Sequence, residues 1–552
     1  MASVEATEMT QPFGNSVGSP LRFAAICDSA MLERWQASTL RELLHGVSEL
    51  AAIVVLDRQS RDRQSSGGML RRFMMPQERE IANSIDDVFR NLDVSVPKYS
   101  IDQDDELLEL GLDFILYLGF GPCDARSARI AKYGLWRFRF GDVSKYENYP
   151  PGVHEVISGD PVTTAVLCSQ HFGTTSAKVL RSGVFATILH QPNANAEQML
   201  SEVTLWPAYA AANICRGHQD DAGDFIELKS IPLPQLPKLV TQARLALSLL
   251  TNKIMRLPNL FFDDSWNVGI VDGPIHDFLQ PAAPWQASWF PNGDPNLYCA
   301  DPMGAIVDGK RLVLCETYDF RTQLGSISAL GVDGRGWTPT IAPALSLKVH
   351  ASYPYLFRAE DVLYCVPETS QARDAVLYRF ASFGDGLQYE KSLLPQVPCL
   401  DPTVFKHEGL WWLFCTDATD GEHLKLRIWF ARDLLGDFMP HPLNPVKIDV
   451  RSSRPAGAPF VHDGRLFRPS QDCSRTYGGA VTINEITKLS PTRFQEHAVA
   501  IVRPDPGSPY RSGVHTLSSF GDQTLIDSKR MIFTGRGIRE KMSAAVARIL
   551  RR

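Results

Sequence analysis

The stretch DPMGAIVDGKRLVLCETYD (residues 301–319) reads as a β-hairpin, and three later stretches repeat its pattern. They are YPYLFRAEDVLYCVPETS (353–370), DPTVFKHEGLWWLFCTDAT (401–419) and GAPFVHDGRLFRPSQDCS (457–474). Each has an apolar run, a turn centred on DG, ED or EG, and a second apolar run. Their starts lie 52, 48 and 56 residues apart, which is the length of one four-stranded blade of a β-propeller.

A weaker fifth copy, GVHTLSSFGDQTLIDS, begins at Gly513. Five units of this length predict an all-β five-bladed propeller over residues 261–535. The strand WNVGIVDGPI (266–275) precedes the first copy and is expected to complete the last blade, because closing the ring removes the exposed sheet edges.

The part of the chain before the repeats has a different periodicity. Apolar runs such as LRFAAICD (21–28), AAIVVLD (51–57) and DFILYLG (113–119) alternate with helical patterns. This alternation predicts a multidomain protein whose first domain is an α/β, Rossmann-like sheet domain. We expect a flexible tail at 1–20, the α/β domain at 21–195, a helical linker at 196–260, the propeller, and a basic helix at 536–552.

Composition limits the classes of partner. The chain has 552 residues, 56 basic and 62 acidic, with a formal net charge of −6, which argues against a nucleic-acid-binding protein. The polar N-terminus lacks the pattern of a signal peptide, so we expect a cytoplasmic protein with its ten cysteines reduced. The basic helix at 536–552 either docks on the body or contacts a membrane surface. No CxxC or HExxH motif occurs, and we predict neither a metal site nor a cofactor. The oligomeric state is left open.

The register of the repeats predicts which candidate functional residues lie close together. The start of one strand of a hairpin and the end of the next lie at the same edge, so residues fifteen apart in each copy should meet at one rim. These pairs are Asp301 with Glu316, Tyr353 with Glu368, Asp401 with Thr416, and Gly457 with Asp472. Carboxyl groups crowded at one mouth push each other's pKa values apart, which suits acid/base cleavage of a glycosidic bond.

We therefore predict a catalytic set and a set of substrate contacts. The catalytic candidates are Asp301, Glu368 and Asp401. The substrate-binding candidates, with polar groups expected near the same rim, are Glu316, His350, Tyr353, Arg454, Gln471, Asp472, Tyr477, Glu485 and His515. For each carboxylate a structural role stays open, because Asp before Pro can cap a turn and Glu after a strand can be solvated. Asp308, Glu408 and Asp463 are expected to form the turns at the other edge.

The motifs NVGIVDGPI, HASYPYLF, RPAGAPFVHDGRLFRPSQDCS and YGGAVTINEI, together with the repeats, resemble the propeller-type N-terminal domain of plant glucosamine inositolphosphorylceramide transferases and its bacterial relatives. The resemblance covers roughly residues 260–530. A more remote resemblance, through Asp301-Pro302, is to five-bladed glycoside hydrolases. It implies a base role for Asp301 and acid or pKa-modulating roles for Glu368 and Asp401. The expected partner is a glycan or a sugar-containing small molecule.

The front domain resembles formyltransferases of the methionyl-tRNA and sugar-amine type through DFILYLG, GLWRFRFGD and PPGVHEVISGDPVTTAVLCSQHFG. The family's Asn-x-His pair and downstream Asp appear here as Trp136, Phe138 and Thr175, which cannot relay a proton. We therefore expect a degenerate domain in a protein that hydrolyses or transfers a glycosyl group. Two alternatives remain: an amino-sugar formyltransferase with a glycan-binding propeller, and a non-catalytic glycan-binding or assembly protein.

Overall fold

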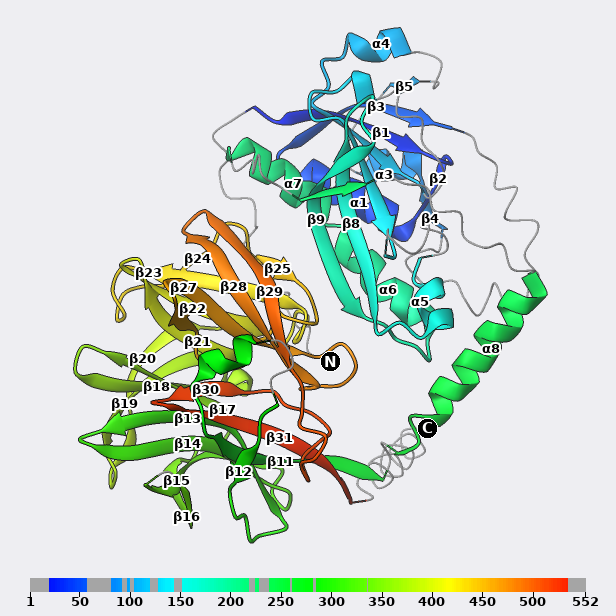
Figure 1. Ribbon diagram of the computed structural model, residues 1–552. Coiled ribbons are helices and arrows are strands. Elements are labelled where there is room, and N and C mark those ends of the chain that lie inside the picture. Colours follow the sequence, from blue (N-terminus) through cyan, green and yellow to red (C-terminus); the bar gives the residue numbers. More distant parts are fainter. Residues whose placement is uncertain are drawn as a thin grey trace, which may run out of the picture. The chain divides into compact units, whose positions relative to one another are not determined.

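The computed structural model divides into two compact units near residue 252 (Figure 1). It describes residues 19–56, 81–91, 97–99, 104–119, 128–142, 151–217, 224–227, 238–258, 261–280, 284–334 and 336–534. The predicted tail at 1–20 lies almost wholly outside the described residues, and the predicted basic helix at 536–552 lies wholly outside them. No helix among the described residues is long and apolar enough to cross a membrane.

The first unit is built on an eight-stranded mixed sheet of order β10-β9-β8-β7-β6-β1-β3-β5. The neighbours β5, β3, β1, β6 and β7 run parallel, whereas β7 and β8 run antiparallel. The strands are β1 (Leu21–Cys27), β3 (Ser48–Val55), β5 (Lys98–Tyr99), β6 (Phe114–Leu118), β7 (Leu135–Phe140), β8 (Val162–Gln170), β9 (Ser176–Ala186) and β10 (Phe225–Glu227). A small separate sheet pairs β2 (Met31–Glu33) with β4 (Ile81–Ser84). The predicted α/β class of this domain is thereby confirmed.

Helices accompany the sheet of this unit. They are α1 (Arg34–His45), α3 (Ile85–Asn91), α4 (Asp104–Leu108), α5 (Val153–Ser158), α6 (Pro192–Val203), α7 (Trp206–Cys215) and α8 (Lys238–Ile254). Of these, α1 and α6 contact the strands β3 and β8 of the sheet. The unit extends past residue 195, where we expected it to end. Helix α6 contacts β8, and α7 contacts α1, because both helices bury apolar side chains such as Met199 and Trp206. These two helices therefore belong to the α/β unit rather than to a linker.

The second unit is the predicted five-bladed propeller. Its first four blades follow the chain in order, and the inner strands of the first three, β13, β17 and β21, contact one another in turn. Blade 1 consists of β13 (Leu297–Val307), β14 (Lys310–Asp319), β15 (Leu324–Asp333) and β16 (Gly336–Leu345), and blade 2 of β17 (Ser352–Ala359), β18 (Val362–Glu368), β19 (Asp374–Ser382) and β20 (Gly386–Pro395). Blade 3 consists of β21 (Cys399–His407), β22 (Leu410–Asp417), β23 (Lys425–Ala431), β24 (Met439–Pro440) and β25 (Lys447–Ile448). Blade 4 consists of β26 (Phe460–His462), β27 (Arg465–Asp472), β28 (Ala480–Ser490) and β29 (Arg493–Val502).

The fifth blade is completed by a strand from the other end of the unit, as the sequence predicted. It consists of β30 (Leu517–Phe520), β31 (Gln523–Phe533), β11 (Phe262–Val271) and β12 (Ala287–Trp289). Strand β11 pairs antiparallel with β31 along its whole length, from Phe262 opposite Phe533 to Val271 opposite Thr524. This pairing joins the two ends of the repeat array, so the ring has no open seam.

The turns at the outer ends of the first hairpins have the conformation that their sequences demand. Asp308-Gly309, Glu408-Gly409 and Asp463-Gly464 all have positive φ at both positions, with values between 48° and 80°. This is the type I′ geometry whose twist matches that of the flanking strands. The predicted role of Asp308, Glu408 and Asp463 as turn formers is confirmed, and these residues lie at the edge opposite the carboxyl cluster described next.

Candidate active site at the inner rim of the propeller

The inner strands of three blades share a bulge at the same position. The ladder skips two residues between Ala300 and Met303, between Ser352 and Tyr355, and between Leu400 and Thr403. The first skipped residue is Asp301, Tyr353 or Asp401, with φ of 53°, 43° and 50°, and a proline follows each. Proline is tolerated because no ladder hydrogen bond is required there. Left-handed backbone at non-glycine residues costs free energy and is found where a side chain must be re-aimed.

Carboxylates hold the backbone N–H groups that these bulges expose. The N–H of Asp301 donates to Oδ2 of Asp527 at 2.8 Å, and that of Asp401 donates to Oε2 of Glu368 at 3.1 Å. The N–H of Tyr353 donates to Oδ2 of Asp301 at 3.2 Å. The bulges are therefore stabilised by the same carboxyl groups that gather at the rim, which links blades 1, 2, 3 and 5 into one network.

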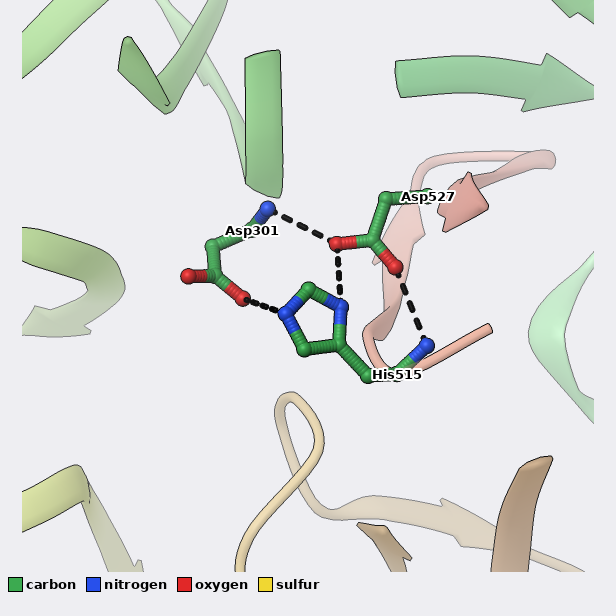
Figure 2. Close-up of side chains that lie close together, drawn as sticks. All are labelled: Asp301, His515 and Asp527. Carbon is green, nitrogen blue, oxygen red and sulfur yellow. Dashed lines mark hydrogen bonds and ion pairs between the residues drawn. The ribbon is translucent and has the colours of Figure 1, made fainter. Parts of the chain in front are cut away.

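Asp301 faces a histidine that lies between two carboxylates (Figure 2). Nε2 of His515 is 3.4 Å from Oδ1 of Asp301, and its Nδ1 is 2.7 Å from Oδ2 of Asp527. The hydroxyl of Thr516 also donates to Oδ1 of Asp301 at 2.7 Å. Burial opposes the charged imidazolium, but the carboxylates of Asp527 and Asp301 outweigh it and raise the pKa of His515 above its usual value.

Ligand-type atoms of Asp301, His515 and Asp527 lie within 4.8 Å of one another, a spacing that can also hold a metal ion. Here both ring nitrogens of His515 face a carboxylate, so the imidazolium itself supplies the positive charge between the two acids. Burial raises the pKa of Asp301 to about 6, with His515 opposing the shift. Asp301 therefore loses its proton just below neutral pH.

Glu368 and Asp401 meet around one buried arginine. Nε of Arg454 donates to Oδ2 of Asp401 at 2.5 Å, and its second terminal nitrogen lies 3.4 Å from Oε2 of Glu368. The side-chain amide of Gln471 donates to Asp401 at 2.8 Å. Burial, followed by the charge of Asp401, raises the pKa of Glu368 to about 8, while Arg454 opposes the shift. Glu368 is therefore protonated at neutral pH, beside an arginine that is already paired with Asp401.

Glu316 lies one blade away, directly opposite Ala300 in the hairpin of blade 1. Its Oε1 atom is 3.3 Å from Nε2 of His350, and the Nδ1 atom of His350 accepts a hydrogen bond from the N–H of Gly325 at 3.0 Å. Burial and then the charges of Asp301 and Glu368 raise the pKa of Glu316 well above its usual range. Its carboxyl group therefore belongs to the same cluster as the predicted catalytic set.

Most of the predicted site residues lie at the same rim, but some of them support the fold instead of facing a substrate. Tyr353 is fully buried, and its hydroxyl both accepts a hydrogen bond from the N–H of Gly457 at 2.7 Å and contacts Thr403 at 3.0 Å. Tyr353 thus supports the inner strands rather than facing solvent. Asp472 caps its own turn by accepting from the N–H of Ser474. Tyr477 lies in the rim cluster, 5.3 Å from the ring of His515 and 5.2 Å from the guanidinium of Arg454.

The predicted position of Glu485 is wrong. We expected it at the same rim, but in the β27–β28 ladder Glu485 pairs with Phe467, whereas Asp472 pairs with Ala480 at the opposite end. Its carboxylate forms an ion pair with Arg465, beside the turn at Asp463. The error came from placing this strand by its motif alone, because β28 runs away from the rim and carries Glu485 with it.

Asp527 and Thr516 belong to the site and were not predicted. Asp527 is fully buried in β31, where it accepts hydrogen bonds from the backbone N–H groups of Asp301, His515 and Thr516. The available signal was an acidic residue directly after the apolar pair Leu525-Ile526, within the pattern of a strand. A buried carboxylate in a strand needs several donors, so its position marks a polar network.

The first unit offers no acid/base pair at the positions aligned with a formyltransferase site. Trp136 is fully buried and stacks on Phe114 with ring centroids 3.9 Å apart, and Phe138 packs edge-on against Trp35. Thr175 is exposed and lies in the turn before β9. Trp136 and Phe138 are thus part of the hydrophobic core of this unit.

Residues 285–509 match the protein family described as glucosamine inositolphosphorylceramide transferase 1, N-terminal. This range contains all four strong repeats of the propeller. The chain is 32% identical over 210 residues to glucosamine inositolphosphorylceramide transferase 1 of Oryza sativa subsp. japonica, and 30% identical over 259 residues to the Arabidopsis thaliana protein of the same name. These alignments cover 37% and 42% of this chain but only 28% and 34% of the plant proteins. The chain thus spans about a third of the length of these relatives.

Two solved structures are similar to parts of this chain. A family-43 glycoside hydrolase is 15% identical, with 41% of this chain and 85% of that chain covered and a TM-score of 0.32. Glycinamide ribonucleotide transformylase 1 from Symbiobacterium toebii is 9% identical, with 38% of this chain and 96% of that chain covered and a TM-score of 0.29.

Proposed function

We propose that the propeller acts on a glycosidic bond, by hydrolysis or by transfer of the glycosyl group, with Glu368 as the acid and Asp301 as the base. The observation that carries the proposal is that two carboxyl groups of one buried cluster differ in pKa. The pKa of Glu368 is raised to about 8 and that of Asp301 to about 6, both mainly by burial. Between these values one group is protonated and the other is ionised.

The surrounding residues support this division of roles. The charge of Asp401 is one of the causes that raise the pKa of Glu368, which is the effect required of a pKa modulator. Asp401 itself is fixed by Arg454 and Gln471. On the other side, His515 and Thr516 stabilise the ionised form of Asp301. Each carboxyl group thus has a neighbour that favours the protonation state it needs.

In the reaction, Glu368 donates its proton to the glycosidic oxygen as the bond from that oxygen to the sugar carbon breaks. Asp301 accepts a proton from the attacking hydroxyl as the new carbon–oxygen bond forms. That hydroxyl belongs to water in hydrolysis and to an acceptor alcohol in transfer. Exchange with solvent then returns both groups to their starting states. The plant relatives are named as transferases, which supports the chemical class but not a particular acceptor.

The test begins with the purified full chain on a glycan array, followed by mass spectrometry of products formed from each glycan that binds. We expect turnover of at least one bound glycan, because the acid and the base are both in place. The variants Asp301→Asn and Glu368→Gln keep the shape of each side chain, and each is expected to lower kcat by about 100-fold or more.

Matched controls make the same chemical changes at the opposite edge of the propeller. Asp308→Asn and Glu408→Gln lie in type I′ turns, and Asn also tolerates the positive φ of Asp308. These controls should retain wild-type turnover. Saturable glycan binding without any product would instead establish a binding protein, and an Asp301→Asn variant as active as the wild type would remove the proposed base.

A further inference from the structure

Helix α8 is attached to the first unit along one side. Leu245 is buried there, and the hydroxyl of Ser248 donates to the carbonyl oxygen of Val156 in α5 at 2.8 Å. The side-chain amide of Asn252 donates to the hydroxyl of Ser248 at 3.1 Å and to the carbonyl oxygen of Leu189 at 3.4 Å. Residues three or four positions apart lie on the same side of a helix, so these contacts fix which side of α8 faces the unit.

The opposite side of α8 is a stripe of exposed aliphatic side chains, Leu247, Leu250 and Ile254, which we call the α8 stripe. These residues also follow one another at spacings of three and four, and each is between 53% and 65% exposed. Because an α-helix turns by about 100° per residue, the centre of the stripe lies about 160° around the axis from the side that faces the unit. Met255 and Leu257, which come directly after the helix, are exposed as well. Apolar surface of this kind is typical of a site that contacts a partner.

The segment around α8 carries positive charge only. No acidic residue occurs between Glu227 and Asp263, although the whole chain has a formal net charge of −6. The basic residues of this segment are Lys229, Lys238, Arg244, Lys253 and Arg256. Arg244 and Lys253 are exposed and lie about 90° to either side of the α8 stripe, so cationic groups flank the apolar surface.

A second copy of the chain fits this surface poorly. If two α8 helices packed stripe against stripe, Arg244 and Lys253 of both copies would flank the interface, and neither helix has an acidic residue to pair with them. The helix has 17 residues, which is only about two heptads, whereas coiled-coil seams extend over three or four. The partner must therefore offer negative charge at its surface and apolar groups beneath it, as an anionic lipid bilayer does.

We propose that α8 lies in the surface of a lipid membrane that contains anionic lipids. The α8 stripe enters the boundary between head groups and acyl chains, and Arg244 and Lys253 reach the lipid phosphates on either side of it. The helix axis is then parallel to the membrane plane, which leaves Ser248 and Asn252 facing the protein. None of these residues takes part in the proposed reaction, so membrane binding can be tested without turnover.

The experiment is flotation of the purified full chain with vesicles on a density gradient. One set of vesicles is phosphatidylcholine alone, and the other is an equal mixture of phosphatidylcholine and phosphatidylserine. We expect the mixed vesicles to bind the chain about 10-fold more tightly or better, because each basic side chain near an anionic surface contributes about fivefold in affinity. Raising the salt concentration from about 0.05 to about 0.5 M should remove most of this preference. A chain that does not float with the mixed vesicles at low salt, or that floats equally with both, would overturn the proposal.

Replacing the α8 stripe tests the apolar contact. The triple variant Leu247→Gln, Leu250→Gln and Ile254→Gln keeps residues that favour a helix, and it should lower the affinity for both kinds of vesicle by about 10-fold or more. The control Leu435→Gln with Met439→Gln changes exposed apolar residues of the propeller and should bind as the wild type does. A triple variant that still floats like the wild type would place the membrane contact on another segment, such as the predicted basic helix at 536–552, and would overturn the role of α8.

Replacing the flanking charges tests the electrostatic contact. Arg244→Gln with Lys253→Gln should weaken binding to the mixed vesicles by about 25-fold and leave the weak binding to phosphatidylcholine unchanged. The control Lys310→Gln with Arg493→Gln makes the same changes at exposed positions of the propeller and should have no effect. An unchanged preference for phosphatidylserine in the Arg244 and Lys253 variant would contradict the proposed orientation of the helix.

Two further measurements on the triple variant distinguish the other occupants of the α8 stripe. Its circular dichroism spectrum and its Tm should equal those of the wild type, because the stripe is exposed in the protein without a membrane. A lowered Tm would show that the stripe packs against another part of the same chain. Light scattering after size-exclusion chromatography should give the same mass for both proteins. A wild-type dimer that the triple variant dissociates would show that a second copy covers the stripe, and either result would overturn the proposal.

Discussion

Asp301 and Glu368 carry the same functional group in similarly buried positions, yet their neighbours separate their titration. Asp301 faces the imidazolium of His515 and the hydroxyl of Thr516, whereas Glu368 lies against the charge of Asp401 and reaches Arg454 only at 3.4 Å. The first environment favours a carboxylate and the second favours a carboxylic acid. The residue types can be read from the sequence. Their pairing cannot, because the partners come from separate blades.

The two pKa values predict the pH dependence of turnover. The base Asp301 must be ionised, which requires a pH above about 6, and the acid Glu368 must be protonated, which requires a pH below about 8. We expect kcat/KM to rise through the first value, to reach a maximum between them, and to fall through the second. The measurement is kcat/KM on a glycan identified by the array, from pH 4 to 10.

The fall of kcat/KM at alkaline pH gives the sharper test of the role of Glu368. Glu368→Gln cannot lose a proton, so its residual activity should no longer fall above pH 8, while the control Glu408→Gln should keep the complete bell shape. A wild-type rate that continues to rise through pH 9 would show that Glu368 does not act as the acid.

At the scale of the element, a bulge on the inner strand of three blades positions Asp301, Tyr353 and Asp401. The fourth repeat has Gly457 at the equivalent position. Gly457 has a φ of 122°, and its N–H donates to the Tyr353 hydroxyl. A Cβ atom there would lie 1.9 Å from the carbonyl oxygen of Leu517 on the next blade. We expect Gly457→Ala to lower the free energy of unfolding by about 3 kcal/mol or more, measured by chemical denaturation.

Gly464 provides the comparison for this substitution. It also has a positive φ, of 73°, but a Cβ atom would have no neighbour within 4 Å. Gly464→Ala should therefore cost only the backbone strain, about 1–2 kcal/mol. Similar losses in the two variants would mean that the close approach between blades does not contribute.

For the whole molecule, closure by β11 makes the propeller one cooperative body with cores separate from that of the α/β unit. Ile270 of β11 is buried together with Leu525 of β31 and Val313 of β14, so it joins the fifth blade to the first. Ile270→Asp places a charge in this core. We expect differential scanning calorimetry to show one transition lowered by about 4 kcal/mol or more in stability, and the transition of the α/β unit unchanged.

The control is Ile501→Asp, on β29, where the residue is 47% exposed. It should leave both transitions within about 0.5 kcal/mol of wild type. A shift of both transitions by Ile270→Asp would show that the two units unfold together.

The sequence by itself determined the blade repeat, the turns at Asp308, Glu408 and Asp463, the closure through 266–275, and the convergence of Asp301, Glu368 and Asp401. These features follow from local periodicity and from the fixed geometry of a hairpin, which residues close in the chain specify. Only the tertiary structure decided that Asp527 supports Asp301, that Arg454 joins Asp401 to Glu368, and that Glu485 lies at the far end of its blade. The contacts of Asp527 and Arg454 join side chains of different blades, and the hairpin pattern within one blade does not specify them. The place of Glu485 depends instead on how far β28 runs from the rim within its own blade.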